Sequence, residues 1–233
     1  MRPRKALTPT HSRASGLASS AVSALEWVPL AIALNGLVLL GAAAGLVVVG
    51  LGPSLVAAST VARAHVRGDL PRVWSTFWRT WRAELGPSTV AYLPLSALLL
   101  MAWVNLSVLS AGPHAWLLPI AWLMVAFLAV ACVWLAPLRA YYDLPPLRSA
   151  LLALRLVVAR PLPSVLHVLF VAAVVFATSR WIILVLLVSV GAAAIVTTYV
   201  AVRTFDDNEM KLAEPPRRDD AGLGLPSEPL RMK

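Results

Sequence analysis

Charged residues and thiols are scarce in this chain of 233 residues. Only 13% of the residues are charged, whereas 59% are hydrophobic. An average soluble domain carries about 25% charged and 45–50% apolar residues, so this composition excludes an ordinary soluble globule. It argues against a soluble enzyme and against a free nucleic-acid-binding domain, and it indicates an integral membrane protein.

The residues that usually build catalytic and metal sites are also missing. The single cysteine, Cys132, lies in an apolar run, and no C-x-x-C pair occurs. Every Asp and Glu falls in a loop, in the tail or near the end of an apolar run; those before the tail are Glu26, Asp69, Glu84 and Asp143. This distribution argues against a proton relay and against paired-carboxylate hydrolysis. No Walker-type loop, H-E-x-x-H, G-x-S-x-G or Rossmann fingerprint occurs. We therefore predict no catalytic, cofactor-binding or metal-binding residues, and a protein that is not an enzyme.

Long apolar runs dominate the sequence instead. They cover about residues 27–51, 89–109, 115–136, 162–177 and 181–202. A transmembrane helix needs roughly 17–25 residues, and four of the five runs meet that length comfortably. The sequence predicts an all-α, polytopic membrane domain over residues 25–205 with about five spans. A basic segment (1–24) precedes it, and a tail (206–233) poor in large apolar residues is expected to be disordered.

Basic residues are distributed unevenly between the two sides of this arrangement. Most of the 20 Lys and Arg residues lie in the loops 63–87 and 138–161 and in the C-terminal tail. Cytoplasmic loops carry an excess of Lys and Arg. Both loops and the C-terminus are therefore expected on the cytoplasmic side of a bacterial plasma membrane.

The side of the N-terminus depends on residues 53–64. Glycine and proline in Gly50-Leu51-Gly52-Pro53 favour a break in the first apolar helix. If residues 53–64 return as a half-helix, the N-terminus is cytoplasmic; if they extend the first span, it is outside. Twelve helical residues cover only about 18 Å, which is short for the hydrocarbon core and favours the extension. Both interpretations stay open at the level of sequence.

The loop 63–87 contains the segment RVWSTFWRTWRAEL. Its aromatic residues recur at helical spacing on one face, and three arginines lie beside them; the residues are Trp74, Phe77, Trp78 and Trp81 with Arg72, Arg79 and Arg82. This pattern predicts an interfacial helix with aromatic anchors in the headgroup zone and arginines near lipid phosphates. The alternative is a helix that packs on loop 138–161, where a second amphipathic helix is predicted.

Two asparagines, Asn35 and Asn105, lie within predicted spans. Such amides usually form hydrogen bonds between helices. A water-filled cavity containing both would instead favour a small transporter or channel subunit with the break at residues 50–53 lining its path. Gly41 and Gly45 have the spacing of a close helix contact, either within the chain or in a homo-oligomer.

Three segments resemble the YesL-like family of bacterial integral membrane proteins. They are GLGPSLVAASTVARAHVRGDLPRVWSTFWRTWRAEL, APLRAYYDLPPLRSALLALRLVVARPLPSVL and YVAVRTFDDNE, and together the resemblance covers roughly residues 25–209. That family is a domain of unknown function without defined catalytic residues. Its members are often encoded beside sugar importers, so the resemblance implies an accessory or regulatory role in carbohydrate uptake.

The expected protein is thus a non-enzymatic component of the inner membrane. Its expected partners are membrane lipids and, through the family resemblance, a carbohydrate transporter complex. Nucleic acid is not expected as a partner, because the basic aromatic helix is tethered between two spans. The alternative function is that of a small membrane transporter or channel subunit.

Overall fold

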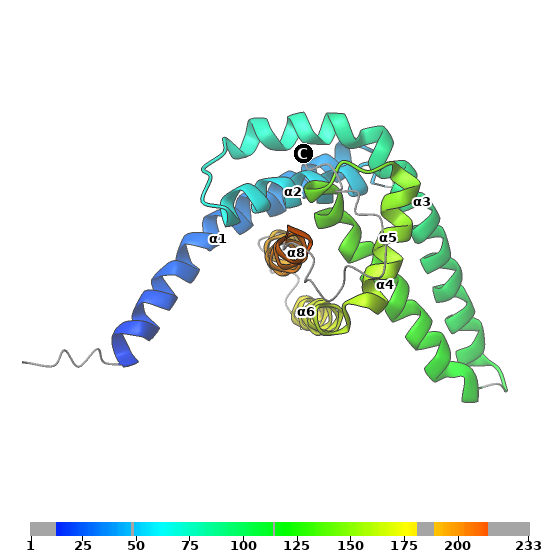
Figure 1. Ribbon diagram of the computed structural model, residues 1–233. Helices are drawn as coiled ribbons and strands as arrows, with labels where there is room; N and C mark the ends of the chain where they lie inside the picture. The colour runs from blue at the N-terminus through cyan, green and yellow to red at the C-terminus, as the bar shows by residue number, and fades with distance from the viewer. Residues whose placement is uncertain (1–12, 48, 114, 181–188, 214–233) are drawn as a thin grey trace, which may run out of the picture.

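The described part of the chain is helical. The computed structural model describes residues 13–47, 49–113, 115–180 and 189–213, and no strand occurs among them. Its helices are α1 (Arg13–Ala44), α2 (Leu51–Val66), α3 (Val73–Ala111), the short 3-10 helix η1 (Ala115–Leu117), α4 (Leu118–Tyr141), α5 (Pro146–Ala159), α6 (Pro161–Arg180) and α8 (Val190–Ala213) (Figure 1). The predicted all-α class is confirmed at this level.

Three helices in the described residues are long and apolar enough to cross a membrane. They are the segment Trp27–Ala44 of α1, the helix α3 and the helix α4. The pair α5 and α6 is bent by 99° at the break between them and makes a fourth crossing if it is one span. The predicted fifth span begins at residues 181–188, which lie outside the described residues.

Large apolar side chains remain exposed along α3 and α4. Met101 is 72% exposed and Leu123 is 70% exposed, and Trp103 and Trp122 are also more than half exposed. A protein dissolved in water rarely displays so continuous an apolar surface, because its contact with water is unfavourable. The hydrocarbon core of a bilayer is a suitable environment for it, which agrees with a membrane protein.

The chain reverses direction between α1 and α2. Leu46 and Val47 adopt left-handed backbone angles, with φ of 55° and 64°. Gly50 packs so tightly that an added Cβ would lie 2.5 Å from the carbonyl oxygen of Gly41. At the far end of the pair, the rings of Trp27 and His65 are 4.9 Å apart, so α2 runs back along α1.

This reversal corrects the predicted end of the first span and decides between the two interpretations of residues 53–64. The first apolar helix ends at Ala44, and not at residue 51. Residues 53–64 do not extend the first span; they form most of α2, which returns beside it. The spacing of Gly41 and Gly45 serves this contact within the chain, because both residues lie against the turn or against α2 and α3.

The predicted surface helix and the predicted second span are parts of one helix, α3. Its first part lies along α2, and its remainder runs beside α4 (Figure 1). Pro87 and Pro94 lie inside the helix. A proline in a helix interior removes a backbone hydrogen bond and bends the helix, which lets α3 change direction without ending.

Helix α8 joins two hydrophobic clusters. One cluster forms around Trp134 and Leu135 of α4 and includes residues of α3 and α5. The other forms around Leu34 of α1, with α2 and the first part of α3. α8 contributes Phe205 to the first cluster and Ile195 to the second. The helices therefore form one connected core that holds the first part of α3 in place.

Candidate functional site

The first part of α3 is attached to α1 and α2 through its aromatic side. Phe77 is fully buried and Trp81 is 8% exposed. Trp81 Nε1 donates a hydrogen bond to Ser54 Oγ of α2 at 3.1 Å. Lipid anchoring by Phe77 and Trp81 therefore does not fit their burial, and that expectation is corrected. The physical reason is the return of α2, which supplies an apolar surface that an extended first span would not offer.

The other predicted contact residues of this segment point outward. Trp74 is 63% exposed, and Arg72, Arg79 and Arg82 are also exposed. Trp78 lies between the two sides, and its ring packs edge-on against Trp74 and Trp81. The arginines and Trp74 thus form an open basic flank on a helix whose opposite side is fixed in the core.

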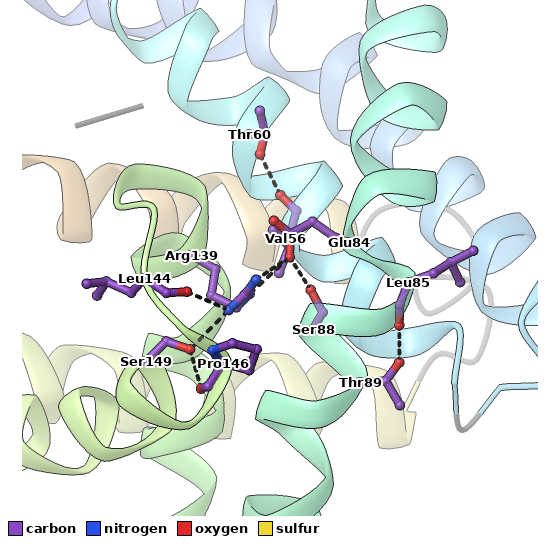
Figure 2. A network of polar contacts seen from close by, with 10 residues as sticks. All are labelled: Val56, Thr60, Glu84, Leu85, Ser88, Thr89, Arg139, Leu144, Pro146 and Ser149. Carbon is purple, nitrogen blue, oxygen red and sulfur yellow. Dashed lines mark hydrogen bonds and ion pairs between the residues drawn. The ribbon is translucent and has the colours of Figure 1, made fainter. Parts of the chain in front are cut away.

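A buried ion pair links the first part of α3 to α4. Glu84 Oε2 accepts hydrogen bonds from Arg139 Nη2 at 2.7 Å and from Arg139 Nε at 3.0 Å. Ser88 Oγ donates to the same carboxylate oxygen at 2.8 Å. The exposed fractions of the Arg139 and Glu84 side chains are only 5% and 6%. Figure 2 shows Arg139 of α4 and Ser88 of α3 both reaching the Glu84 carboxylate.

The same guanidinium also binds α5. Arg139 Nη1 donates to Ser149 Oγ at 3.1 Å and lies 3.5 Å from the carbonyl oxygen of Leu144 (Figure 2). Ser149 Oγ in turn donates to the carbonyl oxygen of Pro146 at 2.6 Å. One arginine therefore connects α3, the end of α4 and the start of α5. Buried charges need such complete pairing, since an unpaired buried ion is strongly unfavourable.

Glu84 and Arg139 fall in the two predicted loops, 63–87 and 138–161, and no role is predicted for either. A sign of the burial of Glu84 was present, because Phe77, Trp81 and Glu84 are spaced for a single helix face. Their shared face predicts a carboxylate among buried aromatic residues. Nothing in the sequence identifies Arg139 as its partner, because 55 residues separate the two.

A second polar network holds the end of α8. Tyr141 Oη donates to Asp206 Oδ1 at 2.6 Å, and Tyr142 Oη donates to Glu209 Oε1 at 2.7 Å. Arg67, directly after α2, forms an ion pair with Asp206 at 3.2 Å. The expected disordered tail is therefore corrected in part, because α8 continues to Ala213 and its Asp206 and Glu209 are hydrogen-bonded. The remainder of the tail, residues 214–233, lies outside the described residues.

The two asparagines of the predicted spans do not meet. Asn35 is fully buried, and its Oδ1 accepts hydrogen bonds from the backbone amides of Val190 at 2.9 Å and Gly191 at 3.3 Å. It thereby satisfies amides at the start of α8, as a capping side chain does. Asn105 is exposed on α3. An apolar cavity of about 280 Å³ lies between α2, α3, α4 and α8, and neither asparagine lines it.

No group of three or more His, Cys, Asp or Glu side chains that could hold a metal ion occurs among the described residues. The charge around the first part of α3 and the end of α4 is supplied mainly by arginine. The arrangement is therefore suited to binding anions rather than cations.

Comparison with known proteins finds one family model that is similar to part of the chain. Residues 31–106 match the model of a family described as "Protein of unknown function, DUF624". The matched region contains most of the apolar part of α1, all of α2 and most of α3. No curated protein and no solved structure matches the chain. The match therefore supports a resemblance to a family of unknown function and assigns no activity.

Proposed function

We propose that this chain is a multi-pass, non-enzymatic protein of the bacterial plasma membrane that binds anionic lipid headgroups through the basic flank of α3. The observation that carries the proposal is the two-sided arrangement of this helix. Phe77 and Trp81 fix one side in the core, while Arg72, Arg79 and Arg82 are exposed on the other. Trp74, beside the arginines, is an amphipathic ring suited to the membrane interface.

The fixed position of α3 favours this role. Ordering a long side chain or a segment on binding costs conformational entropy. The helix backbone is already held by the Trp81–Ser54 hydrogen bond and by the Glu84–Arg139 ion pair. Each Arg near an anionic membrane surface contributes about 1 kcal/mol to attraction. Three such residues on a fixed helix make a headgroup-binding surface.

Contacts between distant segments support a common side for the basic regions. Arg67 of the first loop pairs with Asp206 near the end of α8. Arg160, at the end of the second loop, donates to Asn208 Oδ1 at 3.0 Å. The excess of Arg in these regions argues that this side is cytoplasmic. Because α2 returns beside α1, the N-terminus then belongs on the cytoplasmic side as well.

The second part of the proposal is a protein partner. The resemblance to the YesL-like family suggests an accessory role in carbohydrate uptake, with a sugar importer as the partner. Affinity purification from native membranes, followed by identification of the co-purified proteins, tests this part. Recovery of an importer with the wild-type chain supports it, and repeated purification without one contradicts it.

Lipid binding is tested with the full chain in nanodiscs containing equal amounts of phosphatidylglycerol and phosphatidylcholine. Native mass spectrometry of the released protein then measures which lipid stays bound. The variant Arg72→Glu/Arg79→Glu/Arg82→Glu should lose the preference for phosphatidylglycerol. The variant Arg148→Glu/Arg155→Glu, which reverses two exposed charges on α5, is the control and should keep it. Equal retention of phosphatidylglycerol by the triple variant and the wild type would contradict the proposal.

A further inference from the structure

A polar cavity of about 320 Å³ lies beside the Glu84–Arg139 pair, between α2, α3 and α4. Its polar lining consists of Thr60, Arg63, Arg79, Thr80, Glu84 and Arg139. Ligand pockets in proteins range from about 300 to 1,000 Å³, so this one suits a small group. Arg139 and the Thr60 hydroxyl already donate to protein acceptors, since Arg139 binds Glu84 and Thr60 Oγ1 donates to the carbonyl oxygen of Val56. Arg63 and Arg79 have N–H groups left to donate to an acceptor in the cavity, because a guanidinium carries five N–H donors.

The charges around this cavity do not balance. Glu84 neutralises Arg139 directly. Arg63 is half-buried and, among the described residues, forms no ion pair; its Nη1 donates to the carbonyl oxygen of Tyr141 at 3.3 Å. Arg79, at the exposed edge, has no carboxylate partner in the described part of the chain either. The lining therefore has two positive charges in excess.

The position of Arg63 makes its own charge unfavourable. Burial and, to a smaller extent, the nearby positive charge of Arg67 lower the pKa of the Arg63 guanidinium, and the opposing effects of Tyr141 and Asp206 are weaker than either. An anion within reach of Arg63 would offset both costs, since opposite charges attract strongly where water is partly excluded.

We propose that this cavity binds a phosphate group with two negative charges, either inorganic phosphate or the terminal phosphate of a monoester. A phosphate monoester carries about −1.5 to −2 charges at pH 7, which matches the two excess positive charges. Arginine binds phosphate oxygens through paired N–H donors, and the Thr80 hydroxyl in the cavity lining supplies a further donor. A phosphodiester or a carboxylate carries a single charge and leaves one arginine unbalanced.

This site goes beyond the headgroup-binding flank of α3. Arg63 belongs to α2 and is not part of that flank, so its replacement tests the cavity alone. The monoester can come from solution or from a lipid such as phosphatidic acid, and both sources present the same chemistry. Selectivity for a monoester also separates the cavity from the flank, which is expected to bind any anionic headgroup.

Binding is measured with the purified full chain by isothermal titration with methyl phosphate, inorganic phosphate and dimethyl phosphate. Methyl phosphate and inorganic phosphate should bind saturably, and dimethyl phosphate at least about tenfold more weakly. Arg63→Gln should weaken binding about tenfold or more, as expected for the loss of a hydrogen bond to a charged group. Arg79→Gln should act in the same direction, and because Arg79 is exposed, this variant does not threaten the fold.

Arg67→Gln is the matched control, since Arg67 lies four residues after Arg63, directly after the end of α2, and does not line the cavity. It should change binding by less than about threefold. The source is determined in nanodiscs with phosphatidic acid or phosphatidylcholine. Retention of phosphatidic acid that depends on Arg63 supports a lipid source, whereas binding of free phosphate without such retention supports a soluble one. Absence of saturable binding of all three phosphate probes, equal binding of dimethyl phosphate, or an equal effect of Arg67→Gln would overturn the proposal.

Discussion

Arg139 Nη2 lies 2.7 Å from Glu84 Oε2, and both side chains are almost entirely buried. The two residues belong to segments that the sequence separates into different loops. Their pairing attaches the first part of α3 to the end of α4, and Ser149 extends the connection to α5. The three helices α3, α4 and α5 are therefore joined at a single buried point.

Removal of one partner of this ion pair should destabilise the protein strongly. Glu84→Ala leaves the Arg139 charge buried without its carboxylate, which costs about 3–5 kcal/mol. The double variant Glu84→Leu/Arg139→Met should be less destabilised than Glu84→Ala, because no unpaired charge remains. Thermal unfolding in detergent measures both. A double variant as unstable as the single one would show that the unpaired Arg139 charge is not the cause of the destabilisation.

The turn between α1 and α2 should tolerate no side chain at Gly50. A Cβ there meets three backbone atoms, of Gly41, Ala42 and Gly45, at 2.5–2.8 Å, and backbone cannot move aside cheaply. Gly50→Ala is therefore expected to lower the unfolding temperature. Gly36→Ala is the control, because a Cβ at Gly36 meets nothing within 4 Å. Alanine in place of this helical glycine should stabilise the protein by about 0.5–1 kcal/mol. An unchanged unfolding temperature for Gly50→Ala would mean that the turn is looser than described.

Asn35 and Asn105 should respond differently to the same replacement. Asn35→Leu leaves two amides of α8 without their acceptor, which is expected to cost about 1–3 kcal/mol. Asn105→Leu changes an exposed residue of α3 and should alter stability by less than about 0.5 kcal/mol. Comparison of the two unfolding temperatures checks this directly. Equal losses of stability in the two variants would contradict the proposed role of Asn35 at the start of α8.

The docking of α8 should weaken in strongly alkaline solution. Burial and the hydrogen bond to Glu209 raise the pKa of Tyr142 far above its ordinary value of 10. A raised folded-state pKa means that the neutral tyrosine stabilises the fold, fully below the unfolded-state pKa near 10. That contribution is lost as the pH rises from about 10 towards the folded-state pKa. Unfolding temperatures between pH 8 and pH 11 measure the loss.

The variant Tyr142→Phe separates this group from the other tyrosines. It should be less stable than the wild type at pH 8, by about 1–3 kcal/mol for the lost hydrogen bond to a carboxylate. Its stability should fall less steeply above pH 10, since one titrating group has gone. If the unfolding temperatures of the wild type and the variant fall in parallel above pH 10, Tyr142 is excluded as the cause of the alkaline destabilisation.

The apolar runs of the sequence predict their own helices well. The run 115–136 corresponds to α4, which begins at Leu118 and continues to Tyr141. The spacing of Trp74, Phe77 and Trp81 likewise predicts a helix, and α3 contains it. Both predictions succeed because helix formation depends on neighbours three and four residues apart. Whether a helical face contacts lipid or protein depends on distant segments instead. The prediction that Phe77 and Trp81 anchor in lipid is therefore wrong, since both are buried.

By itself, the amino-acid sequence determined an all-helical chain with membrane-compatible segments and a concentration of arginine between them. Run length and charge are local properties, and a bilayer selects on them directly. Only the tertiary structure decided that α2 returns beside α1, that Glu84 meets Arg139 and that a basic cavity opens next to Arg63. These features join residues far apart in the chain, and their energies come from packing and charge pairing that exist only after the helices have assembled.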